Sequence, residues 1–309
     1  MQISVIIPVI NGASKIDQCL KAVFAQSLQP LEVIVVDGHS TDGTVAIAQK
    51  YPVRIVCENY HTRAGACQVG VDEAIGEFIA FTDADCIPDK DWLRNLSVEV
   101  DVWDSPVGVG GKFEDIGKGL WTRSINLTFT TPLSGARSRW ATRKEMKVLS
   151  VCGANGMVRK KNLLAVGGFK TQLRGGEDLE IATRLGKMGR LIYTPKAVVL
   201  HDHDRGLWDF IKRAFQYGKD RREAKLWDAQ VAVASLSPLL FLTLLYSWVV
   251  LVGIIGCYAF MAFVIGVLTA RQNKEPVFVF SVPIAFVSQH IAFTLGFWKQ
   301  LLDDFKKAP

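Results

Sequence analysis

The chain lacks the short motifs that several common classes of site require. Its 309 residues hold six cysteines, and these form no C-x-x-C pair and have no histidine at zinc spacing. Such usage is typical of reduced, unpaired thiols in a cytosolic domain. The chain also has no G-x-G-x-x-G turn after its first apolar run and no P-loop, which argues against a dinucleotide-binding Rossmann unit and a P-loop nucleotide site. A diphosphate ligand would therefore depend on a cation and on side chains.

Charge is absent from two long stretches near the C-terminus. Residues 231–270 contain no Asp, Glu, Lys or Arg, and about 40 residues of helix would span about 60 Å, twice a hydrocarbon core of about 30 Å. We therefore expect a hairpin of two membrane crossings there. A third apolar segment, 277–298, is long enough for another crossing, but Pro283, Gln289 and His290 interrupt it. It either crosses or forms a re-entrant or interfacial segment.

The N-terminus has no basic leader and begins with an apolar run typical of a strand, not of a signal peptide. We therefore expect a multi-pass protein of the cell membrane whose residues 1–228 lie in the cytoplasm. The basic residues that return after the hairpin, Arg271 and Lys274, agree with the positive-inside rule.

The net charge of +6 raises the question of nucleic acid. The basic residues are not interleaved with stacking aromatics and gather before the apolar stretches, so we expect lipid headgroups and phosphate ligands as partners and no nucleic acid. The basic region 118–147 is either a solvated helical surface or an acceptor loop on the membrane. The pattern over 207–225 predicts an amphipathic interfacial helix.

Strands and helices alternate through the first hundred residues. Apolar, β-branched runs predict strands, and helical spacing with Ser14 as a cap predicts the first helix. This alternation indicates βαβ units and a parallel sheet with right-handed crossovers. The predicted strands are 3–8, 31–36, 53–57 and 78–82, and the predicted helices are 16–24, 63–75 and one beginning near residue 44.

Carboxylates follow two of these strands directly. Asp37 ends the second, and Asp83 and Asp85 follow the fourth, so all three should emerge at the carboxyl edge of the sheet, where open α/β folds bind ligands. An Asp-x-Asp after a strand is often turn chemistry. Carboxylates are also the hard oxygen ligands of divalent cations, so the convergence with Asp37 favours a cation and diphosphate site.

The order of motifs along the chain resembles the family 2 glycosyltransferases of the GT-A fold. The resemblance covers essentially residues 3–205. It implies an α/β fold, in which a Rossmann-like, mostly parallel sheet is flanked by helices, with a C-terminal α-helical membrane region here. The motifs are Val-Ile-Ile-Pro8, Val-Val-Asp37-Gly-His-Ser-Thr-Asp42-Gly-Thr, Asp83-Ala-Asp85, Val166-Gly-Gly-Phe169 and Gly176-Glu-Asp178.

The resemblance also implies roles for individual residues. It places Asp37 on the base or ribose of a sugar nucleotide and extends the donor contacts to Pro8 and Val9. It places Mg²⁺ or Mn²⁺ on Asp85, with Asp83 nearby. The chain departs from the family at Ala66-Cys67-Gln68, and Arg63 is the candidate to replace this donor contact.

For the chemistry, the resemblance implies that Asp178 is the catalytic base. Glu177 is implied to orient the acceptor or Asp178. A histidine at a sheet edge is usually a satisfied surface residue, but the family pattern implies that His201 completes the cation or diphosphate site. Glu180 and Arg184 have a plain reading as a surface ion pair.

The resemblance extends to the tail, which is similar to that of succinoglycan-type, membrane-bound members. In place of the Q-x-x-R-W motif of processive members stands Gln216-Tyr-Gly-Lys-Asp220, so repeated chain elongation is not expected. The predicted divisions are a nucleotide-sugar-binding half (1–115), an acceptor half (116–205), an interfacial helix (206–228) and a transmembrane region (229–309).

The expected function is inverting, metal-dependent transfer of a sugar from a UDP- or GDP-sugar to a lipid-linked saccharide at the membrane. An alternative acceptor is a polyprenyl or dolichyl phosphate, whose attacking oxygen is already anionic. A non-catalytic membrane module that binds nucleotide or lipid, and a nucleotidyltransferase, are alternatives from other classes. Four carboxylates argue against the module, namely those of Asp37, Asp83, Asp85 and Asp178. The absence of a Gly-rich basic signature after the first strand argues against the nucleotidyltransferase.

Overall fold

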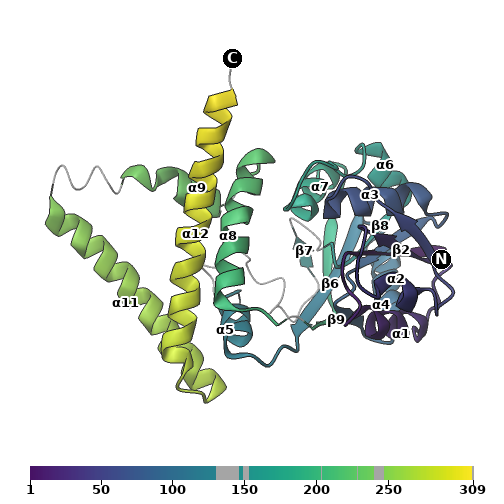
Figure 1. Ribbon diagram of the computed structural model, residues 1–309, viewed down its shortest axis with the longest axis horizontal. Helices are drawn as coiled ribbons and strands as arrows, with labels where there is room; N and C mark the ends of the chain where they lie inside the picture. The colour runs from purple at the N-terminus through teal and green to yellow at the C-terminus, as the bar shows by residue number, and fades with distance from the viewer. Residues whose placement is uncertain (130–145, 149–152, 203, 228, 240–246, 308–309) are drawn as a thin grey trace. The chain divides into compact units, whose positions relative to one another are not determined.

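A computed structural model describes residues 1–129, 146–148, 153–202, 204–227, 229–239 and 247–307 (Figure 1). The chain forms two compact units. Unit 1 comprises Met1–Ile116 and Arg139–His203, and unit 2 comprises Gly117–Ser138 and Asp204–Pro309. The predicted division of residues 1–205 into a donor half and an acceptor half stays a prediction.

The described part of unit 1 is built on one nine-stranded sheet in the order β3-β2-β1-β4-β8-β6-β9-β5, with β7 also paired to β9. The strands are β1 (Ile3–Val9), β2 (Glu32–Asp37), β3 (Arg54–Cys57), β4 (Phe78–Thr82), β5 (Cys86–Pro88), β6 (Gly108–Asp115), β7 (Met146–Val148), β8 (Asn155–Arg159) and β9 (Leu191–His201).

The sheet is mostly parallel, as predicted. From the pairings, β1, β2, β3, β4, β6 and β9 run in one direction, whereas β5, β7 and β8 run in the other. Every residue of β1 and β4 is buried, which is the pattern of strands covered on both faces. The predicted βαβ order of the first four strands is confirmed.

Helices flank this sheet (Figure 1). The helix α1 begins after Lys15, whose side chain makes no cap hydrogen bond, so the predicted cap at Ser14 is wrong. The helix α3 is capped by Thr62, whose Oγ1 accepts from the Gly65 N–H at 2.9 Å. The helices of unit 1 are α1 (Ile16–Phe24), α2 (Thr44–Ala48), α3 (Arg63–Glu73), α4 (Trp92–Val102), α6 (Lys160–Ala165) and α7 (Glu177–Leu185).

The strand β9 is continuous through Pro195. It pairs with β6 at Gly110 through Tyr193 and resumes at Lys112 through Val198. Proline cannot donate to the ladder, so the break appears as a register shift inside one strand. The second half of β9 therefore ends beside β6 and β5.

Asn155 ties the centre of the sheet together. It is fully buried, its Oδ1 accepts from the Trp92 Nε1–H at 2.8 Å, and its amide donates to the carbonyls of Lys112 (2.8 Å) and Ala197 (3.1 Å). A Cβ at Gly111 would overlap the Ala197 carbonyl oxygen and the Asn155 amide. The glycine is therefore needed for close backbone approach, as the Gly-rich pattern of this strand indicates.

The described residues of unit 2 are mainly helical, and α12 contacts each of the other helices described in it (Figure 1). A Cβ at Gly218 of α8 would overlap the backbone of Phe293, and a Cβ at Gly296 of α12 would overlap that of Phe215, so the two helices cross closely. The helices are α5 (Leu120–Phe129), α8 (Leu207–Glu223), α9 (Ala229–Leu236), α11 (Trp248–Asn273) and α12 (Phe278–Lys307).

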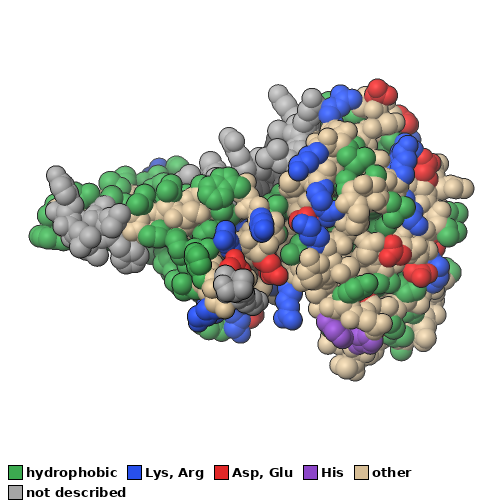
Figure 2. Space-filling view, turned by 90° about the horizontal axis from the view of Figure 1, so that it is seen from above, with side chains coloured by type: hydrophobic (Ala, Val, Ile, Leu, Met, Phe, Trp, Pro, Cys, Tyr) green, Lys and Arg blue, Asp and Glu red, His purple; other side chains and the backbone are tan. Residues whose placement is uncertain are grey.

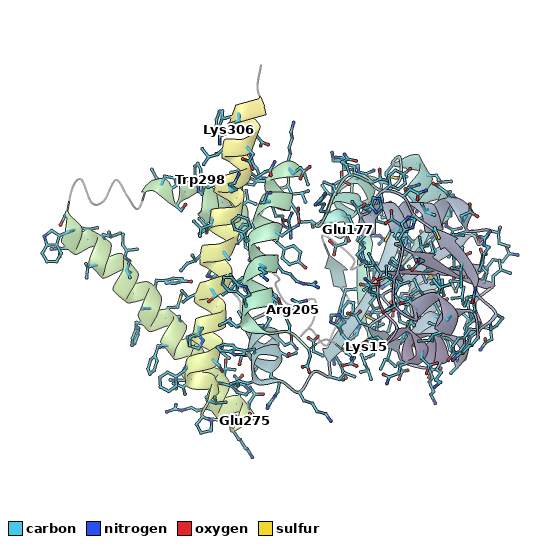
Figure 3. The ribbon with its side chains drawn as sticks, in the orientation of Figure 1. Lys15, Glu177, Arg205, Glu275, Trp298 and Lys306 are labelled. Atoms are coloured by element: carbon cyan, nitrogen blue, oxygen red, sulfur yellow. The ribbon has the colours of Figure 1, made fainter. Side chains whose placement is uncertain are left out.

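Among the described residues, α11 and α12 are long and apolar enough to cross a membrane. Of the predicted hairpin over 231–270, α11 is one arm, whereas α9 has eight residues and would span only about 12 Å. Residues 240–246 lie outside the described residues, so the hairpin stays a prediction. The helix α12 continues through Pro283 to Lys307. In Figure 3, Glu275 is labelled in the turn before this helix and Lys306 near its C-terminal end.

We predict that Asn155→Ala destabilises unit 1 by about 3 kcal/mol, because it leaves the buried Trp92 indole N–H and the carbonyls of Lys112 and Ala197 without their partner. Urea unfolding of the purified protein, followed by tryptophan fluorescence, measures this change. Gln18→Ala, at an exposed position of α1, is the control and should change stability by less than about 0.5 kcal/mol. Equal stability of the two variants would contradict the assigned role.

Candidate functional site

The polar groups of the candidate site gather where strands of one direction end. Asp37 ends β2, Asp83 follows β4, Asp115 ends β6 and His201 ends β9. Because these strands run the same way, their carboxyl ends share one edge of the sheet. The predicted convergence of Asp37 and Asp83 on that edge is confirmed.

Arg63 joins two carboxylates at this edge. Its Nη2 lies 2.6 Å from the Asp83 Oδ1, and its Nη1 lies 2.6 Å from the Glu177 Oε1. Burial favours loss of the guanidinium charge, but the nearby Asp83 and Glu177 carboxylates outweigh it and raise the pKa of Arg63. The first residue of α3 thus links the end of β4 to the start of α7.

His201 lies between two further carboxylates because its strand is paired on both sides. In the sheet it stands opposite Asp115 of β6 and Cys86 of β5. Its Nδ1 lies 3.1 Å from the Asp115 Oδ1, and its Nε2 lies 3.5 Å from the Asp85 Oδ2. Burial would lower the pKa of His201, but the two carboxylates raise it to about 9.

The residues around His201 fit a divalent cation. Ligand atoms of Asp85, Cys86 and His201 all lie within 4.8 Å of one another. A carboxylate oxygen and an imidazole nitrogen suit Mn²⁺, and a carboxylate suits Mg²⁺. The Asp115 contact leaves Nε2 facing Asp85, as in the carboxylate–histidine–metal arrangement. Burial raises the pKa of the Cys86 thiol, so this residue is a poor ligand for a hard cation.

The predicted cation ligands thus fall into two groups. Asp85 and His201 lie together, whereas Asp83 faces Arg63. A role for Asp83 as a ligand stays a prediction.

The loops after β1 and β2 are tied together around Asp37. This residue is 4% exposed, and its carboxylate accepts from the Ser40 N–H at 3.1 Å. The Asn11 N–H donates to the Ser40 Oγ at 2.8 Å, and the Ala13 N–H donates to the Asp42 Oδ2 at 3.0 Å. The register of β1 and β2 also places Pro8 opposite Val36 and Val9 opposite Asp37. The predicted donor residues Pro8, Val9 and Asp37 are therefore neighbours.

Asp178 lies in the first turn of α7. Its Oδ1 accepts from the Leu179 N–H at 2.8 Å, and the helix macrodipole favours a charged carboxylate at this position. Glu177 beside it is buried and is held by Arg63. Figure 3 labels Glu177 at the start of this helix.

Glu180 and Arg184 form the predicted ion pair, but not at the surface. Glu180 is 4% exposed, and its carboxylate also pairs with Lys170 at 2.7 Å. Burial would raise the pKa of Glu180, but Arg184 and then Lys170 outweigh burial and lower it. Arg184 in turn donates to the Val166 carbonyl at 2.5 Å. The pair thus fixes α7 to the Gly-Gly loop that follows α6.

The departure from the family pattern at Cys67 and Gln68 is structural. Cys67 is fully buried, and burial raises its pKa to about 12. The Gln68 Oε1 accepts from the Phe169 N–H at 2.7 Å, and a side chain at Gly168, where φ is +68°, would overlap this amide. Arg63, in the same helix, has a side chain that contacts the site carboxylates of Asp83 and Glu177.

Two site residues were missed from the sequence. Asp115 ends a Gly-rich strand, and its position at a strand end was the available signal. Lys15 pairs with Asp202, whose backbone N–H donates to the Asp85 carbonyl at 2.9 Å. His203 and most of the basic region 118–147 lie outside the described residues.

Comparison with known proteins gives a family match over half of the chain. The model of Glycosyl transferase family 2 matches residues 4–166. A relative from Methanococcus voltae, dolichyl N-acetyl-alpha-D-glucosaminyl phosphate 3-beta-D-2,3-diacetamido-2,3-dideoxy-beta-D-glucuronosyltransferase, is 25% identical over 97% of each chain. The succinoglycan biosynthesis protein ExoA of Rhizobium meliloti is 26% identical over 97% of this chain and 94% of its own.

Among solved structures, the mannosyltransferase PcManGT from Pyrobaculum calidifontis, in complex with GDP-Man and Mn²⁺, has the same fold. Its TM-score is 0.58 with 21% sequence identity, and the match covers 93% of this chain and 87% of that one. The expected GT-A fold is thereby confirmed.

We predict that Glu180→Gln destabilises the protein at pH 7 by about 1–3 kcal/mol, since it removes the buried carboxylate that pairs with Arg184 and Lys170. The folded-state pKa of Glu180 lies below 4.5, so its contribution is full above the unfolded pKa and is lost as pH falls through the folded value. The stability difference between wild type and variant should therefore shrink below about pH 4.5. Urea unfolding at pH 7, 5 and 3.5 measures it, and a difference that is constant with pH would contradict the assignment.

Proposed function

This chain belongs to glycosyl transferase family 2, and on that premise we propose that it is an inverting, metal-dependent, non-processive glycosyltransferase acting at a membrane. The donor is a nucleotide sugar such as a UDP- or GDP-sugar, and the acceptor is a lipid-linked saccharide. One observation carries the proposal: Arg63 joins Asp83, at the end of β4, to Glu177, beside Asp178. The donor-side and acceptor-side carboxylates are thus parts of one site.

The donor half of the proposal rests on the edge formed by β1, β2 and β4. Asp37 would accept hydrogen bonds from the base or ribose, with Pro8 and Val9 beside it in the sheet. Arg63 carries a charge suited to a phosphate oxygen. The PcManGT structure contains GDP-Man and Mn²⁺, which supports a nucleotide sugar and a divalent cation as the ligands.

Asp85 and His201 would hold Mg²⁺ or Mn²⁺, with Asp83 adjacent. When bound, the cation supplies positive charge that stabilises the nucleoside diphosphate leaving group. Asp115 would keep His201 in the orientation that turns Nε2 toward Asp85. The Lys15–Asp202 pair steadies the chain on the other side of Asp85.

Asp178 would act as the base. It would accept the proton of an acceptor hydroxyl while that oxygen bonds to the anomeric carbon from the face opposite the diphosphate. The bond from the anomeric carbon to the phosphate oxygen breaks, and the nucleoside diphosphate leaves. Arg63 fixes Glu177, which would orient the acceptor or Asp178.

The membrane part of the proposal rests on α11 and α12. We propose a multi-pass protein of the cell membrane whose unit 1 is cytoplasmic and whose apolar helices lie in the bilayer. At the polar turn between these helices, Glu275 pairs with Arg123 of α5 at 2.5 Å. The name of the M. voltae relative specifies a dolichyl N-acetylglucosaminyl phosphate, which supports a lipid-linked saccharide as the acceptor.

We predict that Asp178→Asn lowers the turnover number by about 10²- to 10⁴-fold, because a positioned base contributes that factor, and leaves donor affinity nearly unchanged. Product formation by mass spectrometry and donor binding by calorimetry measure the two effects. Asp101→Asn, at an exposed position of α4, is the matched control. Loss of donor binding with normal turnover of the bound donor would overturn the base assignment.

We predict that Asp85→Ala removes the Mn²⁺ dependence of donor binding. Adding Mn²⁺ should raise the affinity of the wild type for the donor by about tenfold or more, which is the size of effect usual when a metal site is altered. The affinity of the variant for the donor should not rise. Calorimetry with and without Mn²⁺ measures this, with Asp89→Ala, an exposed aspartate in the same segment, as the control. If Mn²⁺ raised the donor affinity of Asp85→Ala as much as that of the wild type, Asp85 would be ruled out as a ligand of the cation.

A further inference from the structure

Three adjacent parallel strands are each followed by a non-glycine residue in the left-handed region. Asn11 (φ 51°) follows β1, His39 (φ 64°) follows β2 and His61 (φ 55°) follows β3. A positive φ is uncommon in residues other than glycine, and residues with such strained backbone cluster at ligand sites. Their recurrence at the same edge of the sheet points to a common use of these loops.

Hydrogen bonds hold the three loops in place. The Asn11 Oδ1 accepts from the Thr41 N–H at 2.8 Å, which ties the first loop to the second. The His39 Nε2 lies 3.1 Å from the Asn59 Oδ1, which ties the second loop to the third. The Glu58 carboxylate, 3% exposed, accepts from the His61 N–H at 2.9 Å. The positions of the two histidines are therefore set by the surrounding chain.

The imidazoles of His39 and His61 form an exposed pair. Their ring centroids lie 5.6 Å apart with an interplanar angle of 38°, and both residues are exposed. Figure 2 shows histidine side chains gathered on the surface of unit 1. Two aromatic faces exposed on a strained and fixed backbone contribute little to the core, so a role in stability does not account for them.

The pair lies beside the group that accepts hydrogen bonds at this edge. His39 is two residues from Asp37, and Asp37 stands opposite Cys57 of β3, the strand that leads into the loop of His61. Ile10, 65% exposed, borders the same place, since a Cβ on Gly38 would lie 3.3 Å from the Ile10 Cβ. A buried acceptor carboxylate with exposed flat and apolar side chains around it is suited to a planar heterocycle that carries an N–H donor.

We propose that His39 and His61 form the surface on which the nucleobase of the donor stacks, and that they are specificity-determining residues of this chain. The inference rests on the proposed function, since it assumes a nucleotide sugar at this edge. Stacking on the imidazoles binds any base through its π face, while the Asp37 carboxylate selects bases that present an N–H, such as uracil and guanine.

The test compares ligands with and without a base. His39→Asn and His61→Asn remove the rings and keep a residue that tolerates positive φ. The full chain in detergent is titrated by calorimetry with UDP, with GDP and with inorganic pyrophosphate, each with Mn²⁺. Each variant should bind UDP and GDP about fivefold or more weakly, the lower range for loss of a stacking side chain, and bind pyrophosphate like wild type.

A third variant, Ile10→Ala, removes the apolar side chain that borders the same place. Its control is Ile75→Ala, at an exposed isoleucine of the same unit (70% exposed). The control should bind all three ligands normally, whereas Ile10→Ala should weaken UDP and GDP binding alone. Circular dichroism confirms that each variant is folded, and a variant that fails this check is replaced by His39→Gly or His61→Gly, which also suit positive φ.

Unchanged binding of UDP and GDP by both histidine variants would overturn the inference. An equal loss for pyrophosphate would also overturn it, because it would assign the pair to the cation or the phosphates. Failure of the proposed function is distinguishable: wild-type protein would then bind neither nucleotide and transfer no sugar, whereas failure of this inference alone leaves wild-type binding and transfer intact.

Discussion

The parallel alignment of β1, β2, β4, β6 and β9 is the constraint on which the candidate site depends. Strands of one direction deliver their last residues to the same edge, and in this chain polar residues stand at or directly after the ends of β2, β4, β6 and β9. Asp37, Asp83, Asp115 and His201 come from segments spread over more than half of the sequence. None of them needs a long loop to reach the site, so the rigid sheet sets their separations.

At this edge, charge is divided between two clusters. Arg63 pairs with both Asp83 and Glu177, while Asp85 and His201 form the group suited to a cation. Because Asp83 is occupied by a guanidinium, Asp85 is the better candidate to meet a diphosphate-bound metal. Asp178, two residues before the buried Glu180, lies on a helix that Arg184 and Lys170 hold firmly. In the function we propose, leaving-group stabilisation and proton transfer therefore fall to different elements of the fold.

Local patterns in the sequence predicted much of this arrangement. Mostly apolar runs marked β1, β2 and β4, and the carboxylates at the ends of the second and fourth runs located the edge. Contacts between distant segments could not be predicted in this way. Arg63 and Glu177 are separated by more than a hundred residues, and the burial of Glu180 depends on Lys170 and on the loop it covers. Asp115 was missed because its role depends on the register of β6 with β9.

The apolar tail illustrates the same limit. Composition identified segments able to enter a membrane, and α11 and α12 have the length for it. Composition did not show that α12 continues through Pro283, because a proline in a helix depends on space left by a neighbouring segment. Here that segment is α11, since a Cβ on Gly266 would lie 2.6 Å from the Pro283 Cγ. The glycine therefore makes room for the proline ring.

The central claim is that Asp178 assists a direct displacement at the anomeric carbon while the cation site holds the leaving diphosphate. The most direct test is the anomeric configuration of the first product. Purified protein is supplied with UDP- and GDP-sugars and a lipid-linked saccharide, active donors are found by mass spectrometry, and the new linkage is read by proton NMR. The account predicts a configuration opposite to that of the donor, and a product that retains the donor configuration would contradict it.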